Sequence, residues 1–518
     1  MSNSGLHITP GKFFQWGTIL VGFIAAFKAG NLITDDGYTS VALSFGFLIG
    51  VIAVVTARRH WWLPVLFVLI SGFSTTAVGF KLDATDVMAL FGFLCLAAMM
   101  SMGQLQAKNT QRNLGIFFYL LLGYIAFHAV LYGFDNYFNG DTQFKNIAKR
   151  YYALLIPLIL ICCMDLYAHP KGMRRTVNLM LLCSVLFCSV AVVLTIVQIS
   201  IPGISGVLNF GWADLESVEG YLRGTAPIML LLALCMSSSS PSGWAKILYR
   251  LAVVILLPAS FFGGGRISLL VVLLYIAFWL IIRKKWKLIF AGGWAFAIGL
   301  ALLVIAGYAM NAQQLQNMPR SFQKVQRAIS IFLPSDQLND AEIQTSVSDQ
   351  WHKDLVEGSW DYANEDWHSR ILGNGYKGWD DSIDIATFSY GEAYDEAVKT
   401  AVHMGASETM FFSILPILGW MGVILYYGFM IQIVRRNLMV RNLCPHGTLG
   451  RSLCEFSFCS LLVTLIVSPI SGAIPSYGMI FWMLGFIAAE PYIQKSVRKE
   501  AAPRDHLPPV FRGQLAGR

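Results

Sequence analysis

The sequence predicts an all-α polytopic membrane protein of about fourteen transmembrane helices, with one large loop on its outer side. Of its 518 residues, 56% are hydrophobic and only 13% are charged, whereas roughly a quarter of a soluble domain is charged. Apolar runs of about 20 residues, the length that crosses a bilayer core, recur along the chain. Basic residues gather in alternate short loops, which is typical of helical membrane proteins.

The apolar runs define the expected spans and the organisation of the chain. Eleven spans precede the large loop, near residues 12–28, 39–57, 61–80, 87–102, 114–132, 151–167, 177–200, 222–239, 246–262, 267–282 and 288–309. Three follow it, near 408–434, 452–470 and 474–494. The chain therefore divides into transmembrane helices over 1–309, a loop over 310–407, further transmembrane helices over 408–494 and a tail over 495–518.

Charge in the short loops predicts the orientation. Six alternate loops carry 17 basic residues and no acidic residue, in clusters such as Arg58–Arg59, Arg283–Lys287 and Arg435–Arg451. The positive-inside rule places these loops and both termini in the cytoplasm. We therefore expect a multi-pass protein of the bacterial inner membrane whose loop 310–407 is periplasmic.

The distribution of charge and cysteine argues against several other classes. The net charge of +8 combines −8 in the loop 310–407 with +16 elsewhere, and this segregation indicates membrane topology rather than a nucleic-acid surface. None of the nine cysteines lies in the loop, so neither a disulfide framework nor a cysteine zinc site is supported. We expect no metal, no cofactor and no nucleic-acid partner.

Cationic residues on the expected outer side are the main candidates for chemistry. Arg266 and Arg223 each open a span from that side, and Lys145, Lys149 and Arg150 precede the sixth span. A cation at the bilayer centre costs about 2.5–3.5 kcal/mol, although snorkelling near an interface removes much of this cost. Interfacial anchoring would explain each residue alone. Together, at one level, they suit an anionic headgroup, and the arginine fork suits phosphate.

The large loop contains candidate bases and a group of carboxylates. His352, His368 and His403 are either solvated surface residues or bases that take a proton from an attacking hydroxyl. The carboxylates of Asp380, Asp381 and Asp384 do not follow the spacing of a calcium loop, and they are more typical of a solvated face.

Four stretches together resemble a known family. In chain order they are Arg223–Pro227, Gly263–Leu270, Ser369–Tyr376 and Ser407–Gly422. They resemble the Arg-x-x-Gly segment, the Ser-Arg-Gly turn, the Leu-x-Gly-x-Gly loop element and the re-entering Gly-x-x-Gly segment of the O-antigen polymerase and O-antigen ligase superfamily. The resemblance covers about residues 200–430.

This resemblance implies a C-type glycosyltransferase-like helical bundle with a periplasmic active site between bundle and loop. The implied enzyme is a metal-independent polymerase of bacterial surface polysaccharide (O-antigen or exopolysaccharide). It moves glycan from an undecaprenyl-pyrophosphate donor to a hydroxyl of an acceptor glycan. Arg223 and Arg266 would hold the pyrophosphate and stabilise the developing charge. Further substrate-binding candidates are Lys145, Lys149, Arg150 and Arg370.

The general base is where the sequence departs from the family. Glu408 occupies the position at which the ligases have a histidine, and it could act as a base if an interface raises its pKa. His403, five residues earlier, is the alternative base. The change favours a polymerase over a lipid A-core ligase. Membrane lipid and a chain-length regulator are further partners that the resemblance implies.

Two other functions stay open at the level of sequence. One is an O-antigen ligase-type enzyme that moves finished glycan to a lipid or protein acceptor, since acceptor choice depends on surfaces that the sequence does not define. The other is a flippase or transporter of lipid-linked oligosaccharide. A transporter should line a central path with intramembrane charges, and such charges are scarce in the expected spans.

Overall fold

The structure is a computed structural model, and every regular element in its described residues is a helix. The described residues are 114–138, 144–167, 172–200, 215–239, 243–262, 266–288, 290, 340–376, 394–405, 407, 409–470 and 477–501. Before the large loop lie α5 (Ile116–Phe138), α6 (Phe144–Tyr167), α7 (Met173–Ser200), α8 (Leu215–Met236), α9 (Trp244–Phe262) and α10 (Arg266–Ile282). The loop contributes α14 (Asp340–Ala363), α15 (Trp367–Leu372) and α16 (Tyr394–His403). After it come α17 (Met410–Leu443), α18 (Leu449–Val467), the 3₁₀ helix η4 (Tyr477–Met483) and α19 (Leu484–Ala501).

The described helices match the expected spans in order and type. The spans expected at 114–132, 151–167, 177–200, 222–239, 246–262 and 267–282 fall on α5 to α10. Two described helices, α17 and α18, are long and apolar enough to cross a membrane. The all-helical class is thus confirmed for the described residues. The number fourteen stays a prediction, since the spans expected before residue 114 lie outside them.

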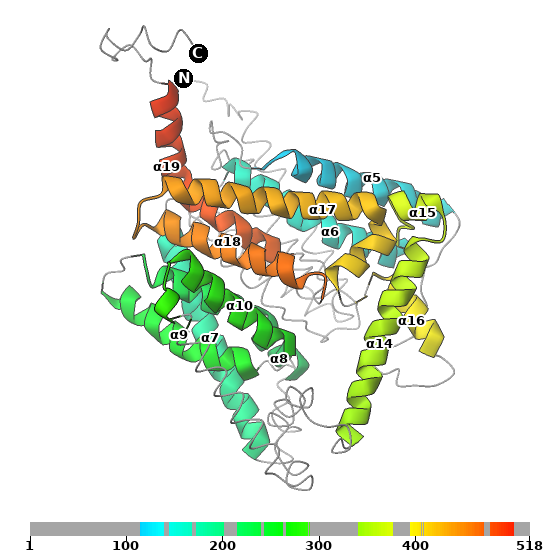
Figure 1. Cartoon of the computed structure of the whole chain (residues 1–518), viewed down its shortest axis with the longest axis horizontal. Helices are drawn as coiled ribbons and strands as arrows, with labels where there is room; N and C mark the ends of the chain where they lie inside the picture. The colour runs from blue at the N-terminus through cyan, green and yellow to red at the C-terminus, as the bar shows by residue number, and fades with distance from the viewer. Residues whose placement is uncertain are drawn as a thin grey trace, which may run out of the picture.

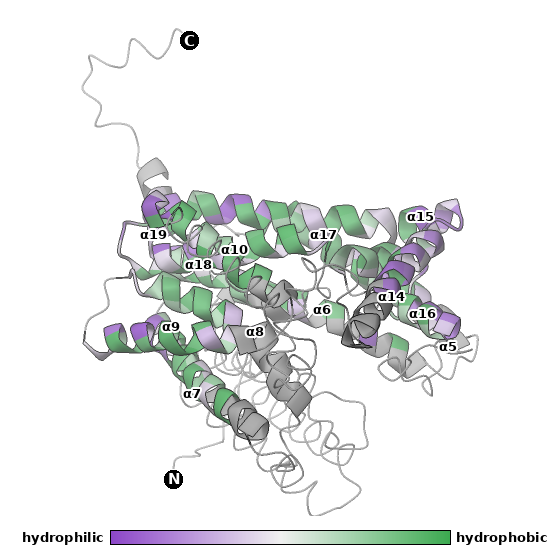
Figure 2. Cartoon of the chain, turned by 60° about the horizontal axis from the view of Figure 1, so that its bottom comes forward, coloured by the Kyte–Doolittle hydropathy of each residue, from purple (hydrophilic) through white to green (hydrophobic). Residues whose placement is uncertain are grey.

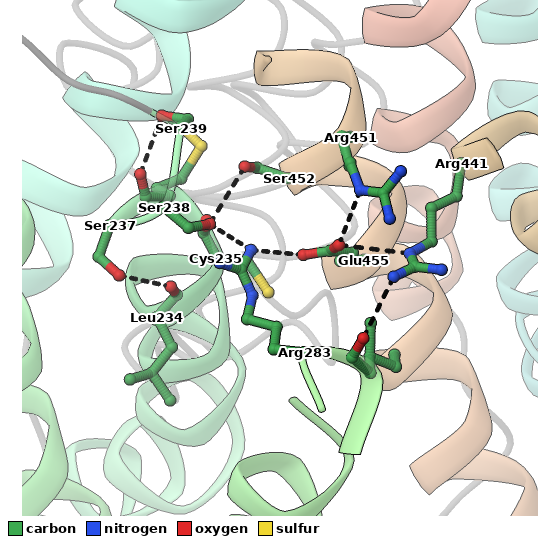
Figure 3. Close-up of polar contacts among 12 residues, drawn as sticks. Leu234, Cys235, Ser237, Ser238, Ser239, Arg283, Arg441, Arg451, Ser452 and Glu455 are labelled. Atoms are coloured by element: carbon green, nitrogen blue, oxygen red, sulfur yellow. Dashed lines mark hydrogen bonds and ion pairs between the residues drawn. The ribbon is translucent and has the colours of Figure 1, made fainter. Parts of the chain in front are cut away.

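One end of the bundle is held by charged side chains. Glu455, near the start of α18, pairs with Arg283 after α10, with Arg441 near the end of α17 and with Arg451 on its own helix. Figure 3 shows this group, and we call the end of the bundle at which it lies the basic end. Because α10 and α17 end where α18 begins, α18 runs antiparallel to both.

The opposite end carries the helices of the large loop. The Phe117 amide near the start of α5 donates to Gln432 Oε1 in the second half of α17 (3.3 Å). The Tyr124 hydroxyl, one third along α5, donates to Leu418 O near the start of α17 (2.9 Å). These helices are therefore antiparallel, and α5 ends beside the start of α17. Figure 1 shows α14 to α16, which we call the cap, at this end, hereafter the loop end.

The bundle is apolar outside as well as inside, whereas the cap is polar. Phe118 and Phe429 are buried in the core, yet Ile247 and Val254 on α9 expose about two thirds of their surface. Figure 2 shows hydrophobic residues along much of α10 and α17 and hydrophilic residues along α14 and α15. Exposed apolar surface of this extent is what a lipid-facing bundle requires.

Several helices extend further into charged sequence than the apolar runs predict. Helix α17 continues to Leu443, so Arg435 and Arg441 belong to a helix instead of a loop. Likewise α6 begins at Phe144 and already contains Lys145, Lys149 and Arg150, while α8 begins at Leu215 and contains Arg223. Extending a formed helix adds one hydrogen bond per residue, and Lys and Arg are good helix formers. Hydropathy marks where a span leaves the apolar layer, not where its helix ends.

Candidate functional site

The loop end is organised by a break in α17. Gly419 adopts φ 61° and ψ −173°, a conformation that is essentially restricted to glycine. Pro416, three residues earlier, has no amide hydrogen to donate. The break leaves successive carbonyls of this turn available to groups from outside the helix. Those of Pro416 and Ile417 accept from the amides of Asn374 (2.9 Å) and Gly375 (3.0 Å).

Two glycines allow the backbones to approach this closely. Gly373 ends α15 with φ 84° and ψ 169°. A Cβ atom on Gly373 would lie 2.4 Å from the Ile417 carbonyl oxygen, and one on Gly419 would lie 2.4 Å from that of Ile371. Any side chain at either position would overlap main chain. We call the contact of 373–375 with 416–419 the glycine junction.

Hydrogen-bonding groups from three helices close around the glycine junction. The Tyr132 hydroxyl on α5 donates to Gly373 O (2.6 Å). Asn374 donates from Nδ2 to Tyr362 O on α14 (2.9 Å) and accepts at Oδ1 from the Ser369 hydroxyl on α15 (2.8 Å). The junction therefore fixes the cap to both α5 and α17 through hydrogen bonds that are buried or partly buried.

The start of α15 is fixed separately by its N-cap. The Asp366 carboxylate accepts from the Ser369 amide at 2.6 Å. This bond stabilises the ionised form and lowers the pKa of Asp366. Ser369 also bonds to Asn374, so it links the N-terminus of α15 to the glycine junction.

Tyr376 lies near Arg150 and near the end of α16, which carries His403, the two sequence-predicted site residues whose side chains are described within the site. Its buried ring packs edge-to-face on Tyr151, the neighbour of Arg150 on α6, with ring centroids 4.9 Å apart. The same ring lies beside Gly405, two residues after His403, because a Cβ on Gly405 would be 3.5 Å from Tyr376 Cε1. Burial raises the pKa of Tyr376 to about 12, and the positive charge of Arg150 opposes this shift. Arg150 and His403 thus both belong to the loop end, on α6 and α16.

His403 is positioned by α14. It is the last residue of α16, and its ring packs on that of Tyr362 with centroids 4.8 Å apart. Burial raises the pKa of Tyr362, so the phenol is a neutral neighbour. The chain after His403 is also fixed, because the Ser407 and Ser359 hydroxyls are hydrogen-bonded (2.5 Å). An imidazole in this place can take a proton from a hydroxyl, as predicted for a base.

The other predicted residues are described less completely. Arg370 lies in the last turn of α15, where it is exposed and donates from Nε to Asn364 Oδ1 (3.0 Å), on the surface of the cap. Arg266 is the first residue of α10, which ends at the basic end, so it starts that helix at the other end. The side chains of Lys145, Lys149, Arg223 and Arg266, and all of Glu408, lie outside the described residues.

A histidine on α5 was not among the predicted site residues. His128 is fully buried between the rings of Tyr124 (4.7 Å) and Tyr132 (5.0 Å). Neither ring nitrogen has a hydrogen-bond partner of good geometry among the described residues, although the Leu372 carbonyl interacts with it. The spacing of four residues from Tyr124 to His128 to Tyr132 places all three on one helix face, and it was the available signal.

Metal ligands are not assembled in the described part of the chain. Within those ranges, no group of three or more His, Cys, Asp or Glu side chains could hold a metal ion. The loop end instead offers an imidazole, tyrosine hydroxyls, main-chain groups and the guanidinium of Arg150. This set can transfer a proton and bind an anion.

Comparison with known proteins adds no assignment. No protein-family model matches the chain, and no curated protein matches it significantly.

Proposed function

We propose that the chain is a polymerase of bacterial surface polysaccharide that works at the periplasmic face of the inner membrane. The glycine junction is the observation that carries the proposal. It joins two of the stretches on which the family resemblance rests, 369–376 and 407–422, by direct main-chain hydrogen bonds. It also holds the cap against the bundle end where Arg150 and His403 lie about Tyr376.

The proposed orientation follows from charge. The basic end carries Arg283, Arg441 and Arg451 from the short basic loops, and the positive-inside rule assigns it to the cytoplasm. The loop end with its polar cap is then periplasmic. Helices α6, α8 and α10 begin on that side, and their first halves contain the cations that the sequence predicts there. The proposed whole is a fourteen-span, C-type glycosyltransferase-like bundle.

The proposed reaction transfers glycan without a metal ion. Arg223 and Arg266, assisted by Arg150, bind the diphosphate of an undecaprenyl-pyrophosphate-linked glycan. A hydroxyl oxygen of the acceptor glycan attacks the anomeric carbon, and the bond from that carbon to the phosphate oxygen breaks. His403 or Glu408 takes the hydroxyl proton, and undecaprenyl pyrophosphate leaves with the bonding electron pair. The arginines stabilise the negative charge that develops on the leaving phosphate.

The test replaces one arginine at each end of the bundle in cells that depend on this chain for polymer. Arg266→Ala should lower polymer synthesis by about 10²–10³-fold, the usual effect of removing one charge-stabilising donor, while the protein stays in the membrane. Arg250→Ala is the matched control, because Arg250 is exposed on α9, which starts near the basic end. Normal polymer length in the Arg266 variant would refute the proposed site.

A second measurement separates an enzyme from a transporter and from a ligase. Purified protein supplied with a lipid-linked repeat unit should release undecaprenyl pyrophosphate, which a flippase does not do. Cells without the protein should still attach single repeat units to the final acceptor. Complete absence of attached glycan would instead indicate a ligase.

A further inference from the structure

A cavity lies at the basic end, remote from the proposed active site. It has a volume of about 470 Å³ and lies where α10 and α17 end and α18 begins. Its wall contains one carboxylate, that of Glu455, and the following five cations: Arg283, Lys284, Lys285, Arg441 and Arg451. The formal charge of the wall is therefore strongly positive.

The three arginines are too buried for water to neutralise them fully. Their side chains are 21%, 15% and 13% exposed for Arg283, Arg441 and Arg451, and that of Glu455 is 4% exposed. Arg441 Nε and Arg451 Nε each lie 3.3 Å from Glu455 Oε1, and Arg283 Nη2 bonds to Oε2 (Figure 3). One carboxylate thus serves three guanidinium groups. Two partly buried positive charges are left without a counter-charge among the described residues, which is costly.

The arginines are also held in place with donor capacity to spare. Arg441 Nη2 donates to Ile282 O (3.3 Å) and Arg451 Nη1 donates to Cys444 O (3.2 Å). The guanidinium of Arg283 packs on the ring of Trp279, 5.4 Å from its centroid. Its buried Nε has no hydrogen-bond partner within the described ranges. Fixed guanidinium groups with N–H groups to spare are suited to bind phosphate oxygens.

The turn after α10 adds two exposed cations to this fixed group. Lys284 has φ 55°, a left-handed conformation that a non-glycine residue seldom adopts. The Lys285 amide closes the turn by donating to Leu280 O (3.0 Å). Both lysines line the cavity and are exposed. Unfavourable backbone conformations of this kind tend to persist where a ligand site needs them.

We propose that this cavity binds a phosphate-bearing anion, whose negative charge balances the surplus of partly buried guanidinium groups. The phosphate belongs either to the headgroup of a membrane phospholipid or to a soluble phosphate compound, and both present the same oxygens to the arginines. Since the cavity lies at helix ends, a headgroup at the bilayer surface can reach it. The site is independent of the proposed polymerase activity, which lies at the loop end.

The test measures phosphate binding and its dependence on the two exposed lysines. The arginines are unsuitable targets, because their loss would break the network about Glu455. The full chain is purified in neutral detergent and titrated with inorganic phosphate against chloride of equal ionic strength. In a second arm it is placed in phosphatidylcholine nanodiscs with or without phosphatidylglycerol, and retained lipid is counted by native mass spectrometry.

The double variant Lys284→Gln with Lys285→Gln should bind phosphate or retain phosphatidylglycerol about tenfold less than the wild type. The control is Lys246→Gln with Lys287→Gln, which removes the same charge from exposed lysines that do not line the cavity. It should bind like the wild type. Binding of inorganic phosphate alone would assign a soluble ligand, and retention of phosphatidylglycerol alone would assign a lipid. Binding in neither arm, or equal losses in both double variants, would overturn the proposal.

Discussion

The helices are held together by different kinds of interaction at the two ends of the bundle. At the basic end, charged side chains from α10, α17 and α18 meet at one carboxylate, Glu455, beside a cavity. At the loop end, main-chain groups of 373–375 and 416–419 bond directly, and no side chain fits between them. Side-chain charges can be shared with a ligand, whereas a contact between backbones cannot. We therefore expect substitutions that remove charge to destabilise the basic end, and substitutions that add volume to destabilise the loop end.

Removing the carboxylate at the basic end should have the largest effect. Glu455→Gln keeps the volume of the side chain but leaves three arginines without a counter-charge. Losing one partner of a buried ion pair typically costs about 3–5 kcal/mol of unfolding free energy. Unfolding of the purified protein in detergent, followed by tryptophan fluorescence, would measure the loss.

The matched control for Glu455 is an exposed glutamate with a partner. Glu357 pairs with Lys353 at 3.7 Å on α14, and its side chain is 61% exposed. Glu357→Gln should change the unfolding free energy by only about 0.3–0.5 kcal/mol. Similar losses in both variants would show that burial does not make the basic end special.

A single methyl group added at Gly419 should destabilise the loop end. Gly419→Ala would combine a forbidden backbone conformation, worth about 1–3 kcal/mol, with an overlap on Ile371 O. We expect a lower melting temperature and faster proteolysis of the cap, while the basic end stays intact. Gly123→Ala on α5 is the control, because nothing lies within 4 Å of an added Cβ there. A fully stable Gly419 variant would contradict the glycine junction.

A smaller effect is expected from one hydroxyl at the same junction. Tyr132→Phe removes the hydrogen bond to Gly373 O but keeps the ring beside His128. The loss should be about 0.5–1.5 kcal/mol, the usual net value of one hydrogen bond. Tyr119→Phe, at an exposed ring on the same helix, should be nearly neutral in the same unfolding assay. Equal effects would mean that the Tyr132 hydroxyl contributes nothing specific.

Hydropathy predicted the helices of the bundle closely where an apolar run has sharp ends. The span expected at 267–282 is α10, and that expected at 246–262 is α9 with two further residues at its start. It failed at the end of α17, because helical hydrogen bonding continues through Arg435 and Arg441 regardless of solvent. The length of a helix and the thickness of its apolar segment are separate quantities.

The candidate site was only partly predictable. Sequence reasoning placed Arg150 and His403 at one end of the molecule, and the structure brings both to the surroundings of Tyr376. It could not foresee that the amides of Asn374 and Gly375 would bond to a break in α17, since that contact depends on long-range packing. Arg370 was grouped with the substrate-binding cations, and its side chain is exposed on the surface of the cap.

The basic end shows a signal that the sequence contained and that charge counting did not use. At the level of sequence, the only use of Arg283, Arg441 and Arg451 was to predict the orientation of the chain in the membrane. Glu455 stands in the apolar stretch Leu453–Phe458, and an isolated carboxylate in such a stretch usually has a nearby cationic partner. Pairing it with the flanking arginines would have predicted that α10, α17 and α18 meet there.

The broken turn of α17 limits how a substrate can arrive. The Pro416 and Ile417 carbonyls are buried acceptors whose bonds come from 374 and 375. Moving α15 away from α17 would leave both carbonyls without a hydrogen-bond donor, at a cost of about 1–3 kcal/mol each. For the proposed polymerase, this predicts that the lipid-linked donor enters laterally from the bilayer and that the product leaves without displacement of α15.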